Sequence, residues 1–75
     1  MAYNLGKQIR CFRRVKGLSG EKLAELSNLS SRGLNNIELG KSEPKFSTVE
    51  RIVKALDISF DELTNENHPL IVGLV

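Results

Sequence analysis

The chain has 75 residues, 40% of them hydrophobic and 27% charged, with a net charge of +2. This length and composition fit one small soluble domain. Its single cysteine, Cys11, and single histidine, His68, exclude an intrachain disulfide and a Cys/His zinc site. No apolar stretch approaches the ~18 residues of a membrane span, and the N-terminus has no apolar signal core, so we expect a cytoplasmic protein without a membrane partner.

The charge is unevenly placed along the chain. Residues 1–16 hold five basic residues and no acid, whereas residues 57–67 hold four acids and no base. A basic pole indicates a polyanionic partner, most often nucleic acid, or simply a solvated helix face. Charge alone does not decide between the two.

The first predicted helix spans residues 4–16. Apolar residues recur there at helical spacing, at Leu5, Ile9, Phe12 and Val15. We expect Asn4 to cap this helix and Gly17 to stop it.

A second helix is predicted from Ser19, its cap, to about residue 27, with Glu21 in its first turn. Its inward positions are Leu23, Ala24 and Leu26. Asn28 is the expected left-handed residue of the turn that follows, because asparagine tolerates positive φ.

Ser30 caps a third predicted helix, over residues 31–39, with Leu34 and Ile37 inward and Gly40 at its end. A turn follows, in which Pro44 disfavours helix at the residue before it.

Two Ser-x-x-Glu sequences predict capping boxes for two further helices. Ser47 and Glu50 open the fourth, with apolar positions Val49, Ile52, Val53 and Leu56. Ser59 and Glu62 open a short fifth helix that ends near residue 64. Five short helices with brief connections predict a compact all-α domain.

Two short helices joined by a tight turn form the helix-turn-helix unit. Ala24 is small where the two helices cross, Asn28 takes the turn, and Leu29, Leu34 and Ile37 hold the second helix against the first. This arrangement presents the second helix to the ~12 Å major groove of DNA while the first crosses the phosphates.

Over residues 5–63 the sequence resembles the Cro/phage-repressor-type, or Xre, family of helix-turn-helix domains. The matching residues are Leu5-Gly6-Lys7, Ile9, Arg13, Leu18-Ser19, Leu23-Ala24, Asn28-Leu29-Ser30, Ile37-Glu38, Gly40-Lys41, Pro44, Lys54-Ala55-Leu56 and Ile58-Ser59-Phe60-Asp61-Glu62-Leu63. The resemblance implies a five-helix, lambda-repressor-like DNA-binding domain over residues 1–65, followed by a short apolar tail, residues 66–75.

The resemblance also implies site residues. Base contacts fall on Ser31, Arg32, Asn35 and Asn36, where arginine suits guanine and asparagine suits adenine. The alternative is a polar helix face that touches nothing. Phosphate contacts are expected from Arg10, Arg13, Ser19, Gly20, Lys41, Ser42 and Lys45.

In relatives a first-helix arginine pairs with the glutamate that ends the recognition helix. Arg13 and Glu38 occupy these positions, and the pair would orient the guanidinium toward a phosphate. The alternative is an exposed ion pair worth ~0–1 kcal/mol.

Four residues depart from the family pattern. Gly20 stands where many relatives have glutamine, Gly33 lies inside the recognition helix, Glu43 would repel a phosphate, and Ser27 replaces an apolar residue. These departures bear on the strength of DNA binding rather than on the fold.

Nothing in the sequence predicts an enzyme, a cofactor or a metal site. The only Cys and the only His are far apart, and the adjacent acids Asp61 and Glu62 are explained by a capping box. Cys11 is expected to be a partly buried packing residue.

The apolar tail is expected to cover the core or to contact a second chain, since in water it would be an aggregation hazard. Relatives commonly bind palindromic operators as dimers, so we expect a homodimer. Its candidate interface residues are Phe60, Leu63, Leu70, Ile71 and Leu74. The alternative is a tail without order.

The predicted function is a sequence-specific regulator of transcription that binds double-stranded DNA. We expect a repressor that binds an inverted-repeat operator as a homodimer. The alternative is a protein-interaction module on the same fold, antitoxin-like or anti-repressor-like, with a protein partner and weak or no DNA binding.

Overall fold

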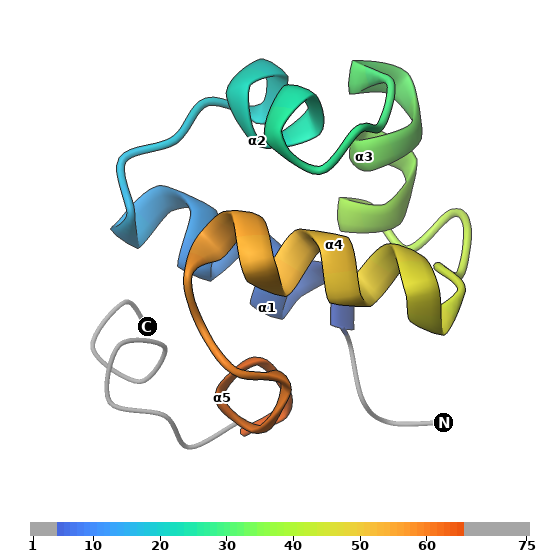
Figure 1. Ribbon diagram of the computed structural model, residues 1–75. Helices are drawn as coiled ribbons and strands as arrows, with labels where there is room; N and C mark the ends of the chain where they lie inside the picture. Colours follow the sequence, from blue (N-terminus) through green and yellow to red (C-terminus); the bar gives the residue numbers. More distant parts are fainter. Residues whose placement is uncertain (1–4, 66–75) are drawn as a thin grey trace.

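The computed structural model describes residues 5–65, which fold into five α-helices (Figure 1). They are α1 (Leu5–Val15), α2 (Gly20–Leu26), α3 (Ser31–Glu38), α4 (Phe46–Leu56) and α5 (Phe60–Thr64). In Figure 1, α2 and α3 lie side by side above α1 and α4, and α5 lies below them. The predicted all-α, five-helix fold is therefore confirmed. Asn4, His68 and the tail lie outside the described residues.

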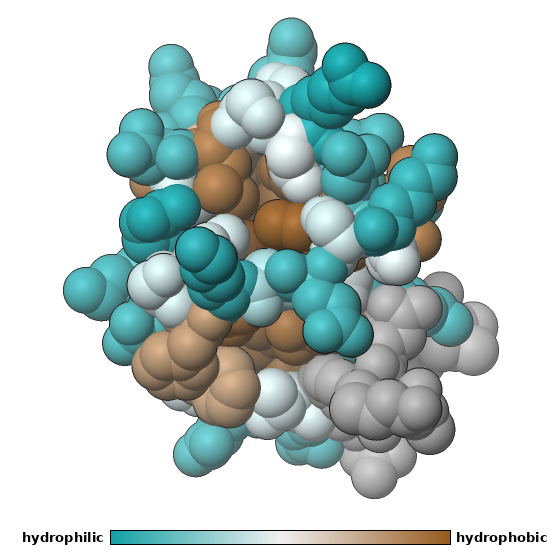
Figure 2. Space-filling view, turned by 90° about the vertical axis from the view of Figure 1, so that its right-hand side faces the viewer, coloured by the Kyte–Doolittle hydropathy of each residue, from teal (hydrophilic) through white to brown (hydrophobic). Residues whose placement is uncertain are grey.

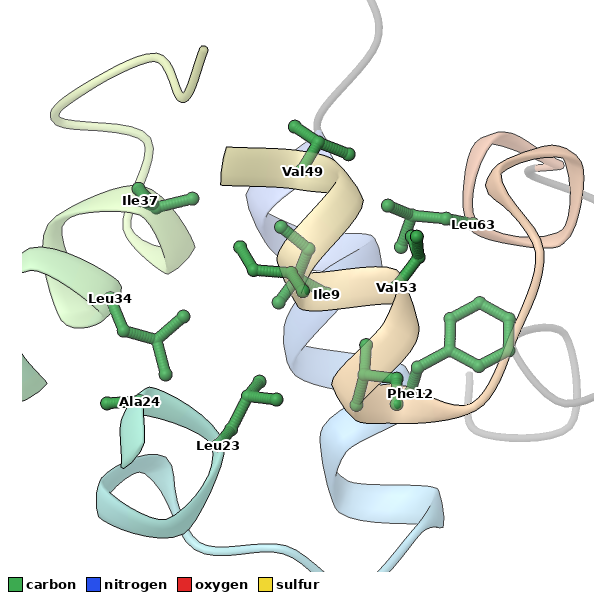
Figure 3. Packing of buried hydrophobic residues seen from close by; sticks show 11 residues of the cluster. Ile9, Phe12, Leu23, Ala24, Leu34, Ile37, Val49, Val53 and Leu63 are labelled. Carbon is green, nitrogen blue, oxygen red and sulfur yellow. The ribbon is translucent and has the colours of Figure 1, made fainter. Parts of the chain in front are cut away.

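The core forms where the apolar faces of all five helices meet (Figure 3). Ile9 of α1 and Leu23 of α2 both point into this core, while the ring of Phe12 points toward α5, whose Leu63 lies beside Val53 of α4. The predicted inward residues of α3 and α4 are also buried: Leu34, Ile37, Val49, Ile52, Val53 and Leu56. Cys11 is half-buried against this core, as expected.

Most predicted helix ends are confirmed. Ser19 and Ser30 accept hydrogen bonds from the Lys22 and Gly33 amides, at 3.0 and 2.9 Å. Gly17 and Gly40 have positive φ just after α1 and α3, as their C-terminal positions require. The last predicted cap, a reciprocal capping box between Ser59 and Glu62, opens α5.

The predicted start of α4 is wrong. The helix begins at Phe46, after an extended Lys45 that makes no side-chain cap, so Ser47 lies inside the first turn. The Val49 amide donates to the Lys45 carbonyl at 3.0 Å, which closes that turn. The earlier start places the Phe46 ring 5.7 Å from Phe60, edge to face, and this packing supports the additional residues.

Leu26 was expected to face inward, but half of it is exposed. Ser27, just after α2, is buried instead of Leu26. Its hydroxyl can be buried because it donates a hydrogen bond to the Leu23 carbonyl at 2.6 Å. Val15 is likewise exposed at the end of α1.

Candidate nucleic-acid interface

Helices α2 and α3 and the turn between them form one hydrogen-bonded unit. Asn28 has φ of 57°, the left-handed conformation predicted for it. The Leu29 amide then donates to the Ala24 carbonyl at 2.8 Å, which closes the turn. Ala24 and Leu34 are both buried where α2 meets α3, and a larger residue than alanine would force the helices apart.

The predicted base-contacting residues occupy the outer side of α3. Ser31, Arg32 and Asn35 are exposed, and Asn36 is half-buried. Residues four apart are neighbours on a helix, so these four form two rows, Ser31 with Asn35 and Arg32 with Asn36. The inner side of α3 carries Leu34 and Ile37. The helix is thus amphipathic, with its polar side available to a partner.

A hollow of about 310 Å³ lies between the first turn of α2 and the outer side of α3. It brings together residues predicted separately as base and phosphate contacts. Its lining consists of Arg13, Ser19, Gly20, Glu21, Ser31, Leu34, Asn35 and Glu38. Figure 2 shows the α3 side of the molecule, where hydrophilic side chains surround small areas of apolar surface.

Arg13 and Glu38 form the predicted pair. Arg13 Nε and Nη2 donate to the two Glu38 oxygens, at 2.8 and 3.1 Å, and Nη1 donates to the Leu18 carbonyl at 3.0 Å. The side chains of Arg13 and Glu38 are only 15% and 6% exposed. The hydrogen bonds that Arg13 donates to the Glu38 carboxylate raise the pKa of Arg13. The pair is therefore a bidentate, largely buried contact and not an exposed ion pair.

The other predicted phosphate contacts lie around this unit. Lys41, Ser42 and Lys45 are exposed in the connection that follows α3. The Lys41 and Ser42 amides donate to the Asn36 carbonyl at 2.9 and 3.3 Å, which folds this connection back onto α3. Arg10 is exposed on α1 and does not line the hollow.

Gly6 is a structural requirement that the sequence reasoning missed. A β-carbon at Gly6 would overlap the carbonyl oxygen of Ile37 and lie 2.9 Å from that of Glu38. Only glycine allows α1 to approach the end of α3 so closely. A glycine within an otherwise regular amphipathic helix was the available signal.

The predicted dimer residues divide into three cases. Leu63 is fully buried in the core of its own chain, so its prediction as an interface residue is wrong. Its position on the inner side of the short α5 leaves none of its side chain for a partner. Phe60 is 42% exposed and contacts Phe46, which is 63% exposed. Leu70, Ile71 and Leu74 lie outside the described residues.

The described part of the chain contains no helix long and apolar enough to cross a membrane. Within residues 5–65, no three His, Cys, Asp or Glu side chains gather where they could hold a metal ion.

A model of the helix-turn-helix family matches residues 12–63. The HTH-type transcriptional regulator PuuR of Escherichia coli is 34% identical over 61 residues, 81% of this chain and 33% of PuuR. The HTH-type transcriptional repressor RghR of Bacillus subtilis is 34% identical over 61 residues, 80% of this chain and 45% of RghR. This chain therefore spans between a third and a half of these two relatives.

Among solved structures, the restriction-modification controller protein C.AhdI from Aeromonas hydrophila is similar along most of its length. It is 34% identical, with a TM-score of 0.78, and the match covers 81% of this chain and 92% of that one.

Proposed function

Because the chain belongs to the helix-turn-helix family, we propose that it binds double-stranded DNA sequence-specifically and regulates transcription. The observation that carries this proposal is the exposed polar side of α3, which projects beside the hollow at the start of α2. Base edges would be read by Ser31, Arg32, Asn35 and Asn36. Arg32 and Asn36 have the fork-like donor and acceptor groups that bind guanine and adenine bidentately.

The phosphate backbone would be held by groups on either side of α3. Lys41, Ser42 and Lys45 would contact it beyond the end of the helix, and Arg10 from α1. Ser19 and Gly20 line the hollow, and the space beside Gly20 is open. The phosphate backbone of DNA could therefore approach the protein main chain at Gly20 without a side chain in between. These contacts would set the register of α3 in the groove without reading sequence.

Arg13 would make two kinds of contact, one within the protein and one with a DNA phosphate. A guanidinium has five N–H groups, and Arg13 uses three of them toward Glu38 and Leu18. The remaining donors belong to a side chain that lines the hollow. Glu38 would thus hold Arg13 while Arg13 binds a phosphate.

We assign the chain a repressor role as a homodimer on an inverted repeat. The relative RghR is named a transcriptional repressor, which supports repression rather than activation. Phe60 and Phe46 form an exposed aromatic pair, the kind of apolar surface that a second copy covers. Two copies related by a twofold axis would place their α3 helices ~34 Å apart, one turn of DNA.

The proposal is tested by selecting sequences from a random duplex pool with the purified protein at physiological salt. We expect enrichment of an inverted repeat whose half-sites are about one helical turn apart. Enrichment of a single half-site would retain DNA binding and reject the dimer. A folded, helical protein that enriches nothing would reject DNA binding and favour the protein-interaction module.

A further inference from the structure

Helix α4 contacts the turn of the α2–turn–α3 unit through one polar side chain. Figure 1 shows α4 lying just below the connection between α2 and α3. From there Arg51 Nε donates to the carbonyl oxygen of Ser27 at 3.0 Å, in a partly buried hydrogen bond. Ser27 is the C-cap residue of α2. This contact therefore joins α4 directly to the turn that precedes α3.

The turn accepts one hydrogen bond from outside the α2–turn–α3 unit. The Leu23, Ala24 and Glu25 carbonyls accept hydrogen bonds from the Ser27, Leu29 and Asn28 amides, all within the unit. The Ser27 carbonyl instead accepts from another helix. Helix α2 also has no basic residue in its own last turn. Arg51 supplies both a donor and a positive charge at this helix C-terminus, where the dipole favours a cation.

The position of α3 depends on this turn. Helix α3 packs against α1 and α2, and α2 packs in turn against α4. The end of α3 is held to α1 by Glu38 and Arg13. Its beginning follows the turn at Asn28, whose left-handed φ of 57° sets the direction in which the chain enters α3.

We propose that Arg51 is a positioning residue for α3: through the Ser27 carbonyl it fixes the turn, and thereby the angle at which α3 meets its DNA. The DNA part of this inference rests on the proposed function. Arg51 would raise DNA affinity without contacting a base or a phosphate, unlike Arg13, which we propose to bind a phosphate from the opposite end of α3.

The chain offers a matched pair of variants for the test. In Arg51→Gln, the amide nitrogen is the same number of bonds from the backbone as Nε, so the donor remains while the charge is lost. In Arg51→Met, a methyl group takes that place and the donor is lost as well. Lys54→Met removes an exposed charge from the same helix and is the control for charge alone.

Two measurements are made on each variant. The first is affinity for a selected duplex across salt concentrations. We expect Arg51→Met to bind about tenfold more weakly with an unchanged salt slope, and Arg51→Gln and Lys54→Met to stay within about threefold of the parent. A salt slope reduced by about one for both Arg51 variants would show a phosphate contact and overturn the proposal.

The second measurement is hydrogen exchange, which needs no DNA. The Leu29 amide, bonded to Ala24, reports on the turn, and the Leu63 amide, bonded to Ser59, reports on the far side of the domain. Arg51→Met should accelerate amide exchange at Leu29 but not at Leu63. Arg51→Gln, which keeps the donor, should show the exchange rate of the parent at both amides. Equal acceleration at both amides, or none, would reject the positioning role. If the parent binds no DNA, the proposed function fails, and this measurement alone decides the role of Arg51.

Discussion

Glu38 holds Arg13 by two hydrogen bonds, of 2.8 and 3.1 Å, across 25 residues of sequence. The contact joins the end of α3 to α1 and places the guanidinium in the hollow beside the polar side of α3. Arg13 thereby stabilises the fold and also lines the surface that we propose to face DNA. Stability and DNA binding can be separated experimentally at this pair.

The single change Glu38→Gln should lower the free energy of unfolding by about 2 kcal/mol, because it leaves a largely buried guanidinium without its charged partner. Thermal denaturation measures this loss. The double change Arg13→Met with Glu38→Leu should recover most of the stability, since burying two apolar residues in place of an ion pair is often neutral. It should not recover DNA affinity. If the double variant bound DNA as the parent does, Arg13 would have no role at a phosphate.

Gly6→Ala should destabilise the domain by about 2 kcal/mol or more. The added methyl group meets backbone, the carbonyl oxygens of Ile37 and Glu38, which cannot move without displacing the end of α3. Gly20→Ala is the control, because nothing lies within 4 Å of a β-carbon there. Chemical denaturation should give a lower midpoint for the first variant only. A parent-like midpoint for Gly6→Ala would show that α1 and α3 can separate freely.

Asn28→Gly should fold as well as the parent, whereas Asn28→Val should lose about 1–2 kcal/mol. The φ of 57° at this position is open to glycine and is unfavourable for a β-branched residue. The difference between the two denaturation midpoints measures the effect. Equal midpoints would mean that the turn adopts another conformation.

Lys41→Gln should weaken binding to all duplexes by a similar factor and reduce the slope of log affinity against log salt by about one. Lys41 is exposed just beyond α3, and we propose that it contacts a phosphate there. Titrations at several salt concentrations give the slope. The matched control is Lys16→Gln, which removes an exposed charge just beyond α1 and should leave the slope unchanged. A loss confined to some sequences would instead place Lys41 in base recognition.

Local rules were sufficient for much of the fold. Ser19, Ser30 and Ser59 cap their helices because each hydroxyl satisfies an amide within its own first turn. The same rule failed at Ser47. There α4 begins one residue before the predicted cap, at Phe46, whose ring packs against a distant residue, Phe60. Such a contact depends on tertiary packing, which a sequence pattern does not contain.

The candidate site was predictable only in part, for the same reason. The amphipathic spacing of α3 was enough to place Leu34 inside and Asn35 outside. The pairing of Arg13 with Glu38 was expected from resemblance to a family, not from spacing. The contacts of Gly6 with Ile37 and of Arg51 with Ser27 join segments far apart in the chain. A glycine within an amphipathic helix is a local signal for the first contact but does not name its partner, and no local pattern marks the second.

We propose above that the exposed side of α3 reads DNA sequence. It is tested most directly by measuring the affinity of the parent and of Arg32→Ala for every single-base-pair variant of a selected site. We predict that the parent discriminates at defined positions, by ~1–3 kcal/mol at each. Arg32→Ala should lose discrimination at one position in each half-site and keep it elsewhere, with its thermal stability unchanged. A uniform loss of affinity at every position, or no change at any, would contradict the claim.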